Sequence, residues 1–113
     1  MLFRSPKGFT VSGGVQNAPQ FSEGEIIPYD PERATNQKIQ IKIASQTPVQ
    51  KAITTMITDN KQKEINMELI DGTETNGTWQ AEWQVDDTYL YTYKAKIEAA
   101  SSQGTQVTTL TLR

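Results

Sequence analysis

The stretch that decides the fold is residues 77–99, which read GTWQAEWQVDDTYLYTYKAKIEA. Nearly every second residue in it is apolar, in two runs that the acidic turn Asp86-Asp87-Thr88 separates. Such alternation is typical of strands that bury one face and expose the other. The stretch therefore predicts two successive strands of a small all-β domain.

Shorter runs of the same kind lie on either side of this stretch. They predict further strands over residues 39–43, 49–58, 65–69 and 107–112. Residues 39–43 give the clearest pattern, because isoleucines alternate there with polar side chains. In residues 49–58 either the even-numbered or the odd-numbered side chains can face the core, and both registers stay open.

The beginning of the chain predicts a first strand that is split into two pieces, residues 9–12 and residues 25–29. The second piece contains Pro28, which has no N–H for a strand ladder, so this strand is expected at a sheet edge. Turn-forming residues over 16–24 predict a loop between the two pieces.

Residues 94–101 also contain good helix formers, so a helix is the alternative for this segment. The period-two alternation continues into it from Tyr89, and no N-cap residue precedes it. A strand is therefore predicted there.

The composition excludes several classes of protein. The 113 residues fit one domain that can bury a hydrophobic core. The net charge of −2 comes from charges scattered singly, so there is no basic stripe for nucleic acid. The chain has neither cysteine nor histidine, which excludes disulfides, thiol nucleophiles and any catalytic pair or metal site that needs histidine.

Membrane insertion by this segment is not expected, because no run approaches the roughly 20 apolar residues of a membrane helix. The first seven residues lack the apolar stretch and cleavage site of a secretory signal. If the parent protein is exported, its signal is expected outside this chain.

Short strands with turn residues between them indicate an antiparallel sandwich of about seven strands. The order of the sequence features over residues 25–112 resembles the immunoglobulin-like and fibronectin-III-like modules of microbial surface proteins. The matching features are Asp30-Pro31, residues 37–41, Thr47-Pro48-Val49, residues 58–60, Asp71-Gly72, residues 76–79, Trp83, residues 86–89, Tyr93, Ala99 and Gly104.

The resemblance implies an immunoglobulin-like two-sheet sandwich over residues 25–113, which forms a single domain with an N-terminal strand and loop over 1–24. The inter-sheet cysteine pair of antibody domains has no counterpart in the sequence. If the strands alternate between the two ends of such a sandwich, the chain is expected to enter and leave at opposite ends.

Six oxygen-bearing side chains are expected at one common end of this sandwich: Asp30, Glu32, Asp59, Asn60, Asp86 and Asp87. Calcium takes six to eight oxygen ligands, and loop carboxylates can supply them. Turn chemistry explains the same residues, since Asp and Asn stabilise tight turns and no Asp-x-Asp-x-Asp-Gly spacing occurs. No metal ligand and no cofactor is therefore assigned.

The aromatic side chains of residues 77–99 have two interpretations. Trp79, Trp83, Tyr89, Tyr91 and Tyr93 can form a platform for sugar rings, or they can fill the core. Core packing is the preferred interpretation, because one face of each strand must be buried; Tyr89 and one tryptophan are expected to be the most exposed. A binding site is then expected in the loops.

Two further patterns have both a functional and a structural interpretation. Asn76-Gly77-Thr78 satisfies the rule for N-glycosylation, but Asn-Gly is also a turn signal, which we prefer. Ser101 and Ser102 beside Gly104, or Asp86 with Asp87, do not make a catalytic pair, because adjacent residues usually point apart. No catalytic residue is assigned.

These observations predict a noncatalytic module of a larger extracellular or cell-surface protein, with an adhesive or spacer role and with neighbouring domains as partners. One alternative is an accessory domain that binds a carbohydrate or another ligand for a secreted hydrolase. Another alternative is a small structural protein that self-associates through its sheet edges.

Overall fold

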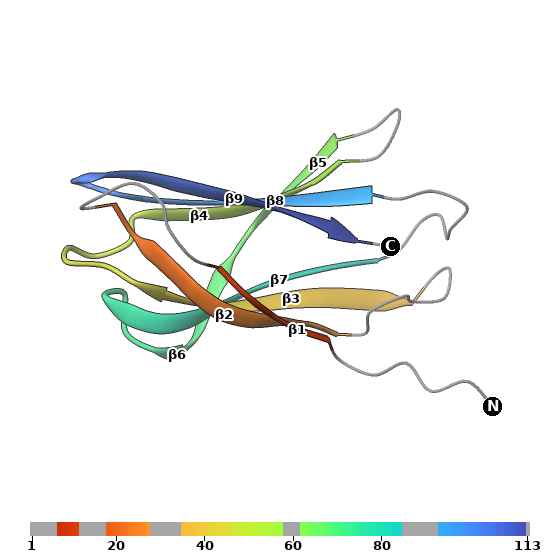
Figure 1. Ribbon diagram of the computed structural model, residues 1–113, viewed down its shortest axis with the longest axis horizontal. Helices are drawn as coiled ribbons and strands as arrows, with labels where there is room; N and C mark the ends of the chain where they lie inside the picture. The colour runs from red at the N-terminus through yellow and green to blue at the C-terminus, as the bar shows by residue number, and fades with distance from the viewer. Residues whose placement is uncertain (1–6, 12–17, 28–34, 58–61, 85–92, 113) are drawn as a thin grey trace.

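The two alternating runs of residues 77–99 are both strands, β7 (Asn76–Gln84) and β8 (Tyr93–Ser101), and they lie in different sheets. A computed structural model describes residues 7–11, 18–27, 35–57, 62–84 and 93–112. In this part of the chain, nine strands form two antiparallel sheets that pack face to face (Figure 1). The predicted all-β, two-sheet sandwich is confirmed.

The five-stranded sheet consists, in spatial order, of β1 (Lys7–Thr10), β2 (Gln20–Ile27), β3 (Asn36–Ala44), β7 and β6 (Glu68–Gly72). The four-stranded sheet consists of β5 (Gln62–Asn66), β4 (Lys51–Ile57), β8 and β9 (Gly104–Leu112). With β2 to β9 lettered A, B, C, C′, D, E, F and G, the sheets read A-B-E-D and C′-C-F-G. In this lettering β1 is an additional strand beside A, and β5, as C′, is the edge strand beside C.

The N-terminal prediction was wrong in three respects. Residues 20–24 are not a loop but the first part of β2, which crosses the expected boundary between residues 24 and 25 as one strand. β1 and β2 are not two pieces of one strand, because they pair antiparallel with each other. β2 is not the edge strand, because it pairs with β1 on one side and with β3 on the other.

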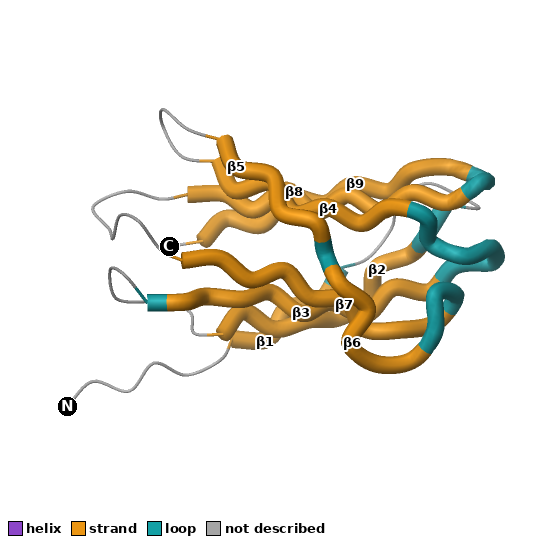
Figure 2. The backbone as a smooth tube through the Cα atoms, turned by 180° about the vertical axis from the view of Figure 1, so that it is seen from behind, coloured by secondary structure: helices purple, strands orange, loops and turns teal. Residues whose placement is uncertain are grey.

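The single strand predicted over residues 65–69 is also wrong. β5 pairs with β4 in one sheet, whereas β6 pairs with β7 in the other. The chain passes from one sheet to the other in the connection between β5 and β6 (Figure 2). Met67, in this connection, has a buried side chain, and its N–H donates to the carbonyl of Ala52 at 2.9 Å. Apolar alternation continues across this passage, which is why the sequence does not mark it.

The described ends of the chain lie at the same end of the sandwich. β1 begins beside the end of β2, with Lys7 opposite Ile26, and β9 ends beside the start of β8, with Leu112 opposite Tyr93 (Figure 1). The expectation of opposite ends was wrong, because β1 is a separate strand that reverses the direction of entry.

The opposite end of the sandwich is held by backbone hydrogen bonds between connections. The N–H of Ser45 donates to the carbonyl of Thr75 at 2.8 Å, and the N–H of Val49 donates to that of Glu74 at 2.9 Å. These bonds join the connection between β3 and β4 to the turn between β6 and β7. The two sheets are therefore linked at this end by main-chain contacts as well as by the core.

The core contains large side chains from one sheet and small side chains from the other. The five-stranded sheet contributes the buried residues Phe21, Ile26, Ile39, Ile41, Ile43, Trp79, Ala81 and Trp83. The four-stranded sheet contributes Ala52, Thr54, Met56, Ala95, Ile97, Ala99 and Gln106. The even-numbered register of β4 is therefore the observed one, and residues 93–101 are a strand rather than a helix.

The described part of the chain contains no helix long and apolar enough to cross a membrane.

Thr54 is a polar residue in the middle of this core. Its side chain is fully buried, and its hydroxyl has no hydrogen-bond partner among the described residues. A buried hydroxyl without a partner loses its hydration without compensation. We predict that Thr54→Val, which replaces the hydroxyl with a methyl group of similar size, raises the free energy of unfolding by about 1 kcal/mol. Chemical denaturation measures this change.

The matched control is Thr55→Val, one residue further along β4 on the outer face, where the side chain is half-buried instead of fully buried. This substitution should change stability by less than about 0.5 kcal/mol. A Thr54→Val variant that is less stable than the parent would show that the buried hydroxyl is satisfied.

Candidate functional site

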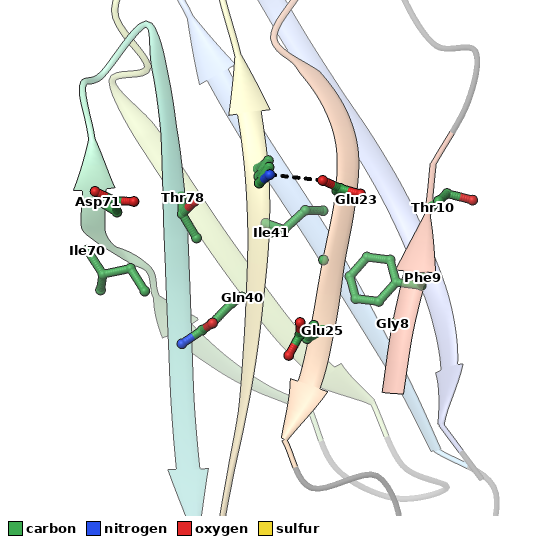
Figure 3. A pocket seen from close by; sticks show the side chains of 12 residues that line it. Gly8, Phe9, Thr10, Glu23, Glu25, Gln40, Ile41, Ile70, Asp71 and Thr78 are labelled. Atoms are coloured by element: carbon green, nitrogen blue, oxygen red, sulfur yellow. Dashed lines mark hydrogen bonds and ion pairs between the residues drawn. The ribbon is translucent and has the colours of Figure 1, made fainter. Parts of the chain in front are cut away.

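The outer face of the five-stranded sheet carries a shallow groove of about 640 Å³. Residues from all five strands line it: Gly8, Phe9, Thr10, Glu23, Gly24, Glu25, Gln40, Ile41, Lys42, Ile70, Asp71 and Thr78 (Figure 3). β3 and β7 form its floor, while β1 and β2 lie on one side and β6 lies on the other.

Two irregularities in strand pairing shape this groove. The pairing of β2 with β3 shifts between Phe21 and Gly24, and that of β6 with β7 shifts between Leu69 and Asp71. Such bulges bend a strand and redirect its side chains. The second bulge leaves Ile70 44% exposed beside the groove.

Gly24 allows β1 to lie close against the groove. A side chain at this position would collide with the backbone oxygen of Gln40 and would come within 2.6 Å of the Phe9 ring. The ring packs against the core cluster in the place that the glycine leaves open. The glycine therefore fixes both β1 and this wall of the groove.

Polar side chains at the floor of the groove and next to it form two rows of strand partners. One row contains Lys42 and Thr78 with Asp71, and the next contains Gln40 and Gln80. The Gln40 amide donates to the Gln80 side-chain oxygen at 2.7 Å, so the two amides are held in a fixed orientation. Both glutamines are half-buried.

Acidic side chains outnumber basic ones on this face. The described carboxylates are Glu23, Glu25, Glu68, Asp71 and Glu82, and the described lysines are Lys38 and Lys42. Lys42 donates to Glu23 at 2.9 Å, and the two side chains remain 59% and 58% exposed. An exposed pair of this kind stabilises the fold little, but it fixes where the ammonium group lies.

The ion pair changes the titration of both groups. The hydrogen bond from Lys42, followed by its charge, lowers the pKa of Glu23. The hydrogen bond and charge of Glu23, together with the more distant charge of Asp71, raise the pKa of Lys42. The small contribution of the Glu23 charge to the stability of the fold is therefore lost as the pH falls through the lowered pKa of Glu23. The contribution of the Lys42 charge is lost as the pH rises through the raised pKa of Lys42.

The tryptophans predicted as core or platform are core. Trp79 is 8% exposed and Trp83 is 7% exposed, and both belong to the hydrophobic cluster between the sheets. Neither indole can stack on a sugar ring at the surface, so the expectation that one would be exposed was wrong. Tyr89 and Tyr91 lie outside the described residues, and of Tyr93 only the backbone, at the start of β8, is described.

All six calcium candidates lie outside the described residues: Asp30, Glu32, Asp59, Asn60, Asp86 and Asp87. The strands that flank their segments do end at one end of the sandwich, since Ile27 pairs with Lys38, Asn36 with Gln84, and Ile57 with both Gln62 and Lys94. Within the described ranges, no group of three acidic side chains is close enough to hold a metal ion.

Asn76, the first residue of the glycosylation pattern, is exposed at the end of the hairpin between β6 and β7. Its N–H donates to the carbonyl of Thr73 at 3.2 Å, and the N–H of Thr73 donates back at 3.1 Å. Gly72 has a φ of 82°, and a side chain at Gly77 would come within 2.7 Å of the Asp71 carbonyl oxygen. The preferred turn interpretation fits this geometry, and the exposed amide is also open to modification.

Ser101 and Ser102 lie in the tight hairpin between β8 and β9. The hydroxyl of Ser101 accepts a hydrogen bond from the N–H of Gln103 at 3.2 Å, and that of Ser102 donates to Thr47 at 3.3 Å. These contacts stabilise the turn. Asp86 and Asp87 lie outside the described residues.

The groove was not predicted from the sequence, which pointed to the loops instead. The available signal is the row of polar residues that alternates with Ile39, Ile41 and Ile43 in β3. This pattern indicates that one face of β3 is exposed to solvent. It does not indicate that β1 and β6 lie on either side of that face and form the sides of a groove. Chemically, the groove offers the fixed amide of Gln40, carboxylates and the ammonium group of Lys42 for hydrogen bonds to a polar ligand.

The pKa directions predict a measurable titration. The carboxyl carbon of Glu23, followed by NMR, should titrate at a lower pH than an ordinary glutamate, because Lys42 stabilises the charged form. Lys42→Gln should raise the midpoint to the ordinary range. Lys38→Gln, four residues earlier on the same face of β3, should leave it unchanged. Equal shifts of the Glu23 midpoint in the two variants would rule out a specific ion pair between Lys42 and Glu23.

Gly24 and Gly8 make a matched pair for testing the wall of the groove. Gly24→Ala should destabilise the protein by about 1 to 3 kcal/mol, the range for overpacking, because the new methyl group meets the Gln40 backbone. At Gly8 a methyl group would lie 3.7 Å from its nearest neighbour, so Gly8→Ala should be neutral or slightly stabilising. Chemical denaturation of both variants measures the difference in their free energies of unfolding. Similar free energies would refute the close approach of Gly24 to the Gln40 backbone.

Comparisons of the chain with protein-family models, with curated proteins and with solved structures found no significant match.

Proposed function

We propose that this chain is a noncatalytic immunoglobulin-like module of a larger extracellular or cell-surface protein, and that its role is adhesive. The observation that carries the proposal is the strand order, A-B-E-D in one sheet and C′-C-F-G in the other. Sandwiches of this order are common in cell-surface domains, although the fold alone does not fix a function.

The surface chemistry supports binding rather than catalysis. The described hydroxyls of Ser101 and Ser102 serve the turn between β8 and β9. The described carboxylate closest to Lys42 is exposed and ion-paired. A general base needs a raised pKa or a hydrogen bond to the group that it activates, whereas the pKa of Glu23 is lowered.

The positions of β1 and β9 favour an adhesive role over a spacer role. Both β1 and β9 meet the same end of the sandwich. A chain that enters along β1 and leaves along β9 would be attached to the module at one end only. The long axis of the sandwich would then project from the chain instead of lying in line with it. The opposite end, with its hydrogen-bonded turns, would then point outward.

The groove favours a second candidate, an accessory domain that binds a hydroxyl-rich ligand such as a carbohydrate. Gln40 lines the groove with an amide that its hydrogen bond to Gln80 holds in place, and Ile70 offers an apolar contact. A glycan-array signal that Gln40→Ala removes, and that Gln103→Ala in the β8–β9 turn leaves intact, would favour this candidate over a protein-binding module.

The proposal is tested on intact cells of the organism that makes this chain. An antibody raised against the purified domain should detect it on the cell surface, and external protease should remove the signal without lysing the cells. Immobilised domain should retain cells or extracellular matrix polymers. Protection from external protease, with release only on lysis, would refute the surface location.

A further inference from the structure

We propose that β9 is an interaction edge of this protein, along which β9 of a second copy pairs in the antiparallel direction. The two four-stranded sheets would then become one continuous sheet of eight strands. Among the described residues, β9 pairs with β8 on one side and with no strand on the other. An unpaired strand edge presents N–H and C=O groups that can bind another strand.

The other three edge strands carry features that oppose such pairing. β1 has four residues and β5 has five, with Lys63 and Glu64 in the middle of β5. β6 has five residues, contains Glu68 and Asp71, and is interrupted by the bulge at Ile70. Short length, charge and bulges are the usual protections of sheet edges. Three of the four edges in the described sheets are therefore protected.

β9 carries none of these protections. It has nine residues, GTQVTTLTL, without a charged residue or a proline. It pairs with β8 in an unbroken register from Gly104 to Leu112. Threonine, valine and leucine make up most of it, and Val107 is 44% exposed. This contrast among the described edge strands is the observation on which the proposal rests.

A second copy fits this edge because β9 complements itself. Antiparallel pairing centred on Thr108 places Val107 opposite Thr109 and Thr105 opposite Thr111 on the outer face. Such β-branched cross-strand pairs are favourable. The seam uses Thr105–Thr111, which avoids Gly104, where an added Cβ would lie 3.4 Å from that of Ala18.

The charges of β8 agree with the same register. Lys96 is the partner of Thr109, and Glu98 is the partner of Val107. When Thr109 of one copy lies opposite Val107 of the other, Lys96 and Glu98 of different copies fall into one row. The row therefore contains opposite charges across the seam, whereas parallel pairing in register would align like charges.

This inference is independent of the proposed adhesive function, because strand pairing at β9 needs neither a surface ligand nor an extracellular location. Failure of the protease test would leave it standing. Conversely, a monomeric protein could still be an adhesive module.

Sedimentation velocity over a series of concentrations tests the pairing. The parent chain should show a monomer–dimer equilibrium. The double variant Val107→Lys/Thr109→Lys should remain monomeric, because its register places lysine opposite lysine twice. Val107→Glu/Thr109→Glu should be monomeric for the same reason, and an equimolar mixture of the two variants should form a heterodimer.

The matched control is Gln62→Lys/Asn66→Lys, which adds the same charge at exposed positions of β5, on the other edge of the same sheet. It should dimerise like the parent. Circular dichroism must show that all variants are folded. A parent chain that is monomeric at every soluble concentration, or a dimer that the β9 lysines leave intact, would overturn the proposal.

The absence of cysteine allows a direct test of the register. In a mixture of Val107→Cys and Thr109→Cys chains, oxidation should give mainly the mixed disulfide, because only that pair is directly opposed. Equal amounts of all three disulfides would overturn the Thr108-centred register. If the parent stays monomeric but a synthetic peptide of residues 104–112 binds along β9, the edge accepts an extended segment and the second-copy proposal is wrong.

Discussion

The structure depends on the fit between large side chains of one sheet and small side chains of the other. Isoleucines of β3 and the tryptophans of β7 fill the five-stranded side, whereas half of the buried core residues of β4 and β8 are alanines. Two sheets can pack about 10 Å apart only if their inner faces interdigitate in this way. The absence of disulfides leaves the sandwich to be held by this fit, together with its strand hydrogen bonds.

Strands whose alternation is strong and local were predictable from the sequence. Ile39, Ile41 and Ile43, the face shared by Trp79 and Trp83, and the inward line from Ala95 to Ala99 are where the pattern places them. The register of β4 was not decidable, because β-branched residues occupy both of its faces and only the opposing sheet chooses between them.

Features that depend on distant segments could not be predicted. The passage at Met67 continues an apolar alternation from one sheet into the other, so no local signal marks it. β2 was missed because Ser22, Glu23 and Gly24 look like turn residues, whereas pairing with both β1 and β3 makes them a bulged strand. The groove was missed for the same reason, since its walls exist only once β1 and β6 have joined the sheet.

The common position of the two described chain ends has a mechanical consequence. In a molecule pulled by its two ends, force acts on β1 and β9, the outermost strands of different sheets. Because both strands are loaded at the same end of the sandwich, the pulling direction lies across the strands. The hydrogen bonds of each edge would then break one after another, as in peeling, instead of sharing the load in shear. Under tension, this sandwich would release its edge strands first and its core of β3, β7, β4 and β8 last.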